Sequence, residues 1–102
     1  MAHTIRQKEK LIARVRRIRG QLDGLERALE AETACGEVLR QLASARGALS
    51  GLTAEVMQGH LDEHVVHAAT EAEREQGAAE MMDVIRALSL IHISEPTRQA
   101  EI

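Results

Sequence analysis

Apolar residues in the first third of the chain recur at alternating spacings of four and three, and this pattern strongly limits the fold. They are Leu11, Val15, Ile18, Leu22, Leu25 and Leu29. Heptad spacing lines one face of a helix, so it predicts a long helix over about residues 4–31, capped by Thr4. A second stripe of the same period predicts a helix over about residues 36–67. It consists of Val38, Leu42, Ala45, Leu49, Leu52 and Val56.

The last third of the chain predicts a shorter helix and then a tail. After a polar loop at residues 68–77, the helical period returns at Ala78, Met81, Met82, Ile85 and Leu88. No alternating strand pattern appears, so the fold class is all-α, with two long helices and one short one. The helical period stops after Leu90, and Pro96 would break a continuing helix. We therefore expect a domain at residues 1–90 and a disordered tail, not necessarily native to it, at residues 91–102.

The chain has few large side chains with which to build a core. It contains 102 residues, no Phe, Tyr or Trp, and one Cys. Such a chain buries little surface alone, so we expect it to oligomerise. No apolar run approaches the roughly 18 residues of a transmembrane helix, and the N-terminus lacks the apolar core of a signal peptide. A lone Cys excludes an internal disulfide, and together these features predict a cytosolic protein without a membrane partner.

Positive charge is concentrated at the N-terminus. Residues 1–20 carry seven cations and one acid, a net +6, and the remainder carries −9. A basic surface on an acidic body suits a polyanion, although a helix face that is merely solvated is the alternative. Without aromatic side chains there is no stacking platform for single strands, so duplex DNA is the expected partner. The predicted phosphate-binding residues are Lys10, Arg14, Arg16, Arg17 and Arg19.

Histidines and the single cysteine form the second candidate site. His60 and His64 stand four apart, so on a helix their imidazoles would share one face and could hold one cation. One thiolate with several imidazoles suits Ni(II), Co(II), Zn(II) or Cu(II). Each residue also has a plainer interpretation, as a surface histidine, a small buried hydrophobe or part of a mobile terminus. The predicted ligands are His3, Cys35, His60 and His64, with Glu63 and His67 as secondary ligands or supporting partners.

Helix length limits how these ligands can meet. Cys35 and His60 are 25 residues apart on the same predicted helix. At the rise of an α-helix this separates them by roughly 37 Å, so they cannot bind one metal ion within one chain. Two such helices packed antiparallel in a dimer would bring Cys35 of one protomer to the histidines of the other. A metal site therefore requires an oligomer.

Several motifs over about residues 2–90 resemble one family. The chain resembles the small all-helical bacterial repressors that respond to metals or formaldehyde, among them the copper sensor CsoR, the nickel/cobalt sensor RcnR and the formaldehyde sensor FrmR. The matching segments include residues 3–6 (HTIR), 14–21 (RVRRIRGQ), Cys35, 45–48 (ARGA), 51–52 (GL), 54–56 (AEV) and 60–67.

This resemblance implies a fold and a function. It implies a three-helix protomer that assembles as a disc-like dimer of dimers. Such a homotetramer would bind operator duplex DNA in the apo form and be released by its ligand, allowing expression of an efflux gene. Cys35, His60 and His64 with His3 look like the nickel/cobalt type, so Ni(II) or Co(II) is the expected ligand and Zn(II) or copper the alternative. Ala34 departs from the acidic residue found at this position in some relatives.

Three other functions remain open. A formaldehyde-sensing repressor would use Cys35 as nucleophile together with the N-terminal amine. The formaldehyde type of this family carries a Pro directly after the initiator Met, whereas the second residue here is Ala2, which argues against that type. A metal buffer would bind metal without DNA affinity. A plain helical interaction module would need neither ligand. An enzyme is not expected, because no convincing acid–base pair accompanies the single thiol.

Overall fold

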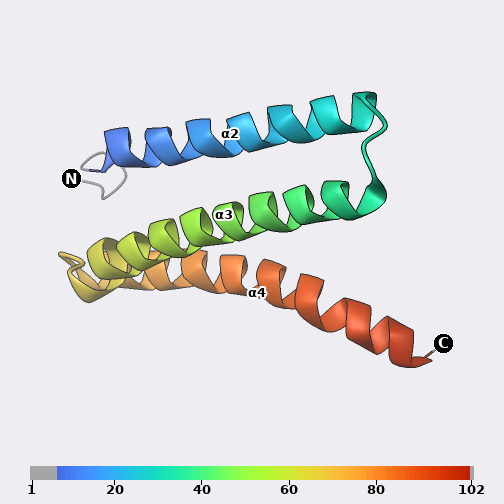
Figure 1. Cartoon of the computed structure of the whole chain (residues 1–102). Helices are drawn as coiled ribbons and strands as arrows, with labels where there is room; N and C mark the ends of the chain where they lie inside the picture. Colours follow the sequence, from blue (N-terminus) through green and yellow to red (C-terminus); the bar gives the residue numbers. More distant parts are fainter. Residues whose placement is uncertain (1–6, 102) are drawn as a thin grey trace. The chain divides into compact units, whose positions relative to one another are not determined.

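The computed structural model describes the backbone of residues 7–101 and the side chains of residues 7–88. It contains the α-helices α2 (Lys8–Glu30), α3 (Cys35–Leu61) and α4 (Glu71–Glu101), with a π-helical segment η1 (Asp62–Val66) directly after α3 (Figure 1). Residues 7–101 include no strand, so the predicted all-α class with three main helices is confirmed. The predicted cap Thr4 lies outside the described residues.

The chain forms two compact units, Met1–Gln58 and Gly59–Ile102. In the first unit α2 and α3 run antiparallel, as polar contacts between them show. The guanidinium of Arg14, early in α2, contacts Glu55, late in α3. Further along α2, Gln21 Nε2 donates to Ser44 Oγ at 3.2 Å. The two heptad stripes thus predicted the helix pair of this unit.

The turn between α2 and α3 is closed by backbone hydrogen bonds. Thr33 N–H donates to Ala28 O at 2.9 Å, and Glu32 N–H donates to Leu29 O at 3.1 Å. This is the Schellman arrangement, which requires a left-handed residue after the helix end. That residue is Glu32, with φ of 55°, although glycine is favoured at such a position. The next helix, predicted from about residue 36, begins one residue earlier, so Cys35 is the first residue of α3.

The C-terminal end of α3 changes from α- to π-helix. The long helix predicted to reach residue 67 is α-helical to Leu61, and η1 continues it to Val66. The N–H of His67 donates to the carbonyl of Asp62, five residues earlier, at 3.0 Å. Single π-turns are rare in proteins, but those that occur are often found at functional sites. This one lies in the histidine-rich segment.

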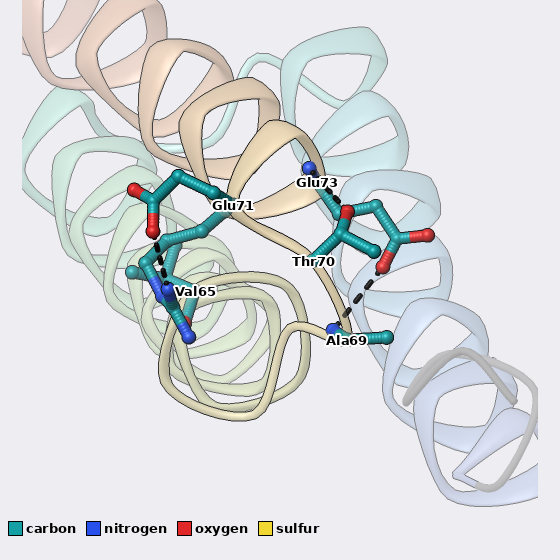
Figure 2. A network of polar contacts seen from close by, with 6 residues as sticks. Val65, Ala69, Thr70, Glu71 and Glu73 are labelled. Atoms are coloured by element: carbon teal, nitrogen blue, oxygen red, sulfur yellow. Dashed lines mark hydrogen bonds and ion pairs between the residues drawn. The ribbon is translucent and has the colours of Figure 1, made fainter.

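The third helix begins earlier than the sequence pattern indicated. Residues 68–77 were predicted as a loop, but α4 starts at Glu71 because its first turn is capped. Thr70 Oγ1 accepts from Glu73 N–H at 3.1 Å, and the Glu73 carboxylate accepts from Ala69 N–H at 3.1 Å. Figure 2 shows Glu73 making both contacts. This is a capping box in which the Glu73 carboxylate accepts from the N–H of Ala69, one residue before the N-cap Thr70, instead of from Thr70 itself.

The third helix also ends later than predicted. The backbone stays helical past Leu90 and across Pro96 to Glu101, so α4 is the longest helix of the described residues and not a short one. A helix can continue without an apolar stripe. A proline inside it removes one hydrogen bond and crowds the carbonyl four residues earlier, which costs about 3 kcal/mol but does not always end the helix. That residues 91–102 lie outside the domain stays a prediction.

The chain buries few side chains. Among residues 7–88, the buried apolar side chains are Ala28, Ala45 and Met81, at 8%, 6% and 5% exposure. Leu29 and Leu49, from the two predicted stripes, remain 59% and 53% exposed. Each stripe therefore presents apolar surface that its own chain does not cover. Within the described part of the chain, no helix combines the length and apolar character needed to cross a bilayer.

The capping box gives a stability prediction. Thr70→Ala removes the side-chain acceptor for Glu73 N–H, and losing such a cap costs about 1 kcal/mol. We expect the free energy of unfolding, measured by urea denaturation with circular dichroism, to fall by that amount. Thr70→Ser keeps the hydroxyl and serves as the control. Equal stability of the Ala and Ser variants would contradict the assigned cap.

Candidate functional site

The structure brings His60 and His64 together. His60 lies in the last turn of α3 and His64 in η1. Their ring centroids are 4.9 Å apart, and the ring planes are tilted by 47°. The four-residue spacing therefore places two imidazoles side by side at the start of the second unit, as predicted.

A hydrogen bond to α4 orients the His60 ring. Its Nε2 lies 3.0 Å from the carbonyl oxygen of Gly77 and 3.5 Å from Glu80 Oε1. A carbonyl oxygen only accepts, so Nε2 must carry the proton, and in the neutral ring Nδ1 then carries the lone pair. Metal-binding histidines usually donate their second N–H to a carbonyl or carboxylate in this way. His60 thus has the bonding arrangement of a ligand that binds through Nδ1.

Gly77 permits a close approach between α4 and η1. It is buried, and an added Cβ would lie 2.9 Å from the carbonyl carbon of His64 and 3.0 Å from its Cβ, and nearer still to its carbonyl oxygen. No side chain fits there without moving one of the two elements. Glycine at this position therefore sets the distance at which α4 lies against the histidine segment.

Arg74, three residues before Gly77, holds the other end of η1. Its Nε donates to the carbonyl of Val65 at 3.0 Å, and its Nη1 lies 2.9 Å from Glu71 Oε2. Figure 2 labels Glu71 and Val65, the two residues that Arg74 contacts here. Carbonyls at a helix end lack partners within the helix, so Arg74 satisfies one that the π-turn leaves. The first two turns of α4 thus fix both ends of the segment that carries His64.

His67 contacts Asp62 at the end of η1. It follows η1 as its C-cap residue, and its Nδ1 lies 2.9 Å from the carbonyl of Asp62 and 3.3 Å from Asp62 Oδ1. Glu63 is half-buried on η1. Secondary metal roles for His67 and Glu63 stay predictions, and the contact that the structure gives His67 is a helix cap.

The predicted sulfur ligand is not beside the histidines. Cys35 is an exposed free thiol at the N-terminal end of α3, and His60 is near the other end of that helix. Over the residues that the structure describes, no three His, Cys, Asp or Glu side chains form a group able to hold a metal ion. His3 lies outside the described residues. Two imidazoles lie together, and one of them, His60, donates to a carbonyl. Any further ligand of a metal bound there would have to come from outside this pair.

The basic residues divide between a groove and an open helix face. A cavity of about 590 Å³ in the first unit is lined by Lys10, Arg14, Arg17, Ile18, Gln21 and Ala48. Arg16 and Arg19 are exposed on α2 and do not line it. Lys10, Arg14 and Arg17 have the i, i+4, i+7 spacing of one helix flank, and the structure places all three on one groove.

Glu55 neutralises part of this basic groove. Arg14 Nη1 donates to Glu55 Oε2, and Lys10 Nζ lies 3.4 Å from Glu55 Oε1. The guanidinium of Arg14 lies over α3 at Gly51, where an added Cβ would be 2.8 Å from Arg14 Nη2. Arg14 was predicted as a phosphate contact, and in this protomer it is bound by a carboxylate.

Four residues of these sites were not singled out from the sequence. Gly77 was assigned to a loop, and Glu55, Arg74 and Thr70 had no role. Thr70 and Glu73 have the capping-box spacing, which was a usable signal. Nothing local marks Glu55 or Arg74, because their partners lie 41 and nine residues away along the chain.

Comparison with known proteins assigns the family. Residues 7–87 match the family model described as metal-sensitive transcriptional repressor. The chain therefore belongs to this family of transcriptional repressors, which are not enzymes. The groove of cations and the paired histidines lie within the matched residues.

Individual relatives are similar over most of their length. The chain is 52% identical over 87 residues to an uncharacterized protein in the bioA 5′ region of Serratia marcescens, with 84% of this chain and 96% of that protein covered. It is 46% identical over 85 residues to the transcriptional repressor RcnR of Salmonella typhimurium, covering 83% of this chain and 94% of RcnR.

Two solved structures share the fold. A variant of the formaldehyde-responsive regulator FrmR from Salmonella enterica serovar Typhimurium matches with a TM-score of 0.76 and 42% identity, covering 83% of this chain and 97% of FrmR. The copper-sensing repressor CsoR with Cu(I) from Geobacillus thermodenitrificans matches with a TM-score of 0.79 and 28% identity, covering 87% and 93%. The resemblance stated from the sequence is confirmed.

The close approach at Gly77 gives a second stability prediction. Gly77→Ala forces α4 away from η1, and such overpacking costs about 1–3 kcal/mol. Gly47→Ala is the control, because nothing lies within 4 Å of its added Cβ and alanine favours a helix by about 1 kcal/mol. We expect thermal unfolding to show a lower Tm for the first variant and an equal or higher Tm for the second. A Gly77→Ala variant as stable as Gly47→Ala would refute the close approach.

Proposed function

We propose that this repressor senses Ni(II) or Co(II) and binds operator duplex DNA in its metal-free form. The observation that carries the proposal is the pair of imidazoles at His60 and His64, with His60 already bonded to the Gly77 carbonyl as a metal-binding histidine would be. We propose that the chain acts in the cytosol, where release from DNA would allow expression of a metal efflux gene.

The donor set favours a borderline metal. Soft thiolates select Cu(I), whereas imidazoles suit Ni(II), Co(II), Zn(II) and Cu(II). Here one thiolate, Cys35, is combined with His60, His64 and His3, and the N-terminal amine completes the proposed set. When bound, the metal supplies a positive centre that holds these groups together. The tightest-binding metal need not be the cognate one, because affinity rises from Co(II) through Ni(II) to Cu(II) at most sites.

A homotetramer built as a dimer of dimers completes the site. Cys35 and His60 stand at opposite ends of α3, so in the proposed dimer the thiol of one protomer meets the imidazoles of another. The exposed apolar side chains support this assembly, since Leu22, Leu29, Leu42 and Leu49 are each at least 45% exposed on the protomer. Covering such stripes is the usual role of a second copy.

DNA binding is assigned to the cations of α2. Lys10, Arg14, Arg16, Arg17 and Arg19 would contact phosphates, for which arginine is suited by its planar pair of donors. Metal-induced release requires that the DNA-incompetent arrangement have the higher affinity for the metal. A coupling of about 1–3 kcal/mol, or 5–150-fold in affinity, is typical of such systems.

Formaldehyde sensing is the alternative that a specific observation favours. Cys35 is an exposed thiol, as a nucleophile toward an aldehyde must be, and FrmR shares the fold. That mechanism would depend on Cys35 and the N-terminal amine and be indifferent to His64. A metal buffer would bind metal without sequence-specific DNA affinity.

The metal assignment is tested by fluorescence anisotropy with the duplex upstream of the gene. Ni(II) or Co(II) should release the wild-type chain, and Cys35→Ala or His64→Ala should abolish release while apo binding is retained, because each variant removes a proposed ligand. Formaldehyde and Zn(II) are added separately as controls. Release by formaldehyde alone, unchanged in His64→Ala, would assign the chain to the aldehyde-responsive type.

The DNA assignment is tested by the salt dependence of affinity. Arg14→Ala should weaken apo binding, and the slope of log K against log salt should become shallower by about 0.9 for each phosphate that the protein no longer neutralises. Arg86→Ala is a control, because Arg86 is paired with Asp83 on α4, away from the groove residues in sequence. An unchanged slope for Arg14→Ala would show that this arginine contacts no phosphate.

A further inference from the structure

The carboxylate of Glu55 occupies the cations that a phosphate would need. Each of its oxygens has a cationic partner: Arg14 Nη1 donates to Oε2, and Lys10 Nζ lies 3.4 Å from Oε1. A phosphodiester likewise presents two unesterified oxygens and a single negative charge. The Glu55 carboxylate therefore has the charge and acceptor geometry of one backbone phosphate.

We propose that an operator phosphate binds Lys10 and Arg14 by displacing Glu55, so that Glu55 is an internal competitor of DNA. This inference rests on the proposed DNA-binding function. The groove that would receive the phosphate is already formed: its volume is about 590 Å³, and Arg17 and Gln21 line it beside the two cations. The phosphate would meet these two further donors, which Glu55 is not seen to contact.

The internal pair is strong enough to compete and weak enough to be displaced. The side chains of Arg14 and Glu55 are 28% and 19% exposed, so their attraction is only partly screened by water. Lys10 is largely exposed and contributes less. DNA presents many phosphates to several protomers at once, and this polyanion can displace a single carboxylate that a free anion would not.

Gly51 lets Arg14 reach Glu55. The guanidinium of Arg14 lies where a Gly51 side chain would be, with Nη2 2.8 Å from the position of an added Cβ. Gly51→Ala would push the flexible end of Arg14 off α3 without changing any charge. The same competition can thus be weakened in two chemically different ways.

The first test is Glu55→Gln, measured on the full chain by anisotropy with operator DNA at several salt concentrations. Removing the competitor should tighten the binding of apo protein to DNA about tenfold. This lies between the small contribution of an exposed ion pair and the larger one of a hydrogen bond to a charged group. The salt slope should stay unchanged, because the same phosphates are contacted. Glu37→Gln is the matched control: it changes the charge equally on the same helix, where Glu37 pairs with Arg40, and should change affinity less than twofold.

Two further variants distinguish competition with DNA from a supporting role of Glu55. In an Arg14→Ala background the gain from Glu55→Gln should largely disappear. Gly51→Ala should also tighten DNA binding. If Glu55→Gln has lost its helical circular dichroism and so has not folded, the affinity of Gly51→Ala is the test of the competition. Equal or weaker DNA binding by Glu55→Gln and Gly51→Ala would overturn the inference and make Glu55 a support for Arg14. A wild-type chain without affinity for duplex DNA would instead contradict the proposed function itself.

Discussion

The missing side chain at Gly77 determines how closely α4 lies against η1, and much of the histidine site depends on that distance. At this separation the Gly77 carbonyl accepts from His60, and Arg74 reaches the carbonyl of Val65. The tautomer of His60 follows from the first contact and the closed end of the π-turn from the second. A backbone position without a Cβ is therefore as important to the site as the imidazoles.

In the first unit, the Glu55 carboxylate offsets part of the positive charge on α2. Cations set close together on α2 repel one another, and Glu55 relieves part of that repulsion at Lys10 and Arg14. Lys10, Arg14 and Arg17 outnumber this one carboxylate, so the groove stays positive with a smaller net charge. One carboxylate on α3 thus joins α2 to α3 and at the same time lowers the positive charge of the groove.

Periodicity predicted the helices whose apolar side chains line one face. It did not predict the ends of α4, which depend on capping contacts and on the backbone. The stripes from Leu11 to Leu29 and from Val38 to Val56 indicated both long helices, because apolar residues spaced by four and three line one helix face whether or not the chain itself covers that face. The early start of α4 depends on Thr70 and Glu73, and its late end crosses Pro96, so neither leaves an apolar repeat.

The candidate site was predictable to a similar degree. The spacing of His60 and His64 was sufficient to place their rings together, because it acts within one helical turn. The carboxylate partner of Arg14 is 41 residues away in the sequence, and no local pattern encodes such a contact. The position of Cys35 at the far end of α3 was anticipated from helix rise alone.

The π-turn also determines how many imidazoles share a face. In an unbroken α-helix, residues seven apart fall within about 20° of one another, so His67 would lie in line with His60. A π-turn absorbs one extra residue, which rotates everything after it by about 100°. His67 is thereby turned from the row and caps Asp62. The number of imidazoles on this face thus depends on the helical register: with the same residues in an unbroken α-helix His67 would join the row, whereas the π-turn leaves His60 and His64 as the pair.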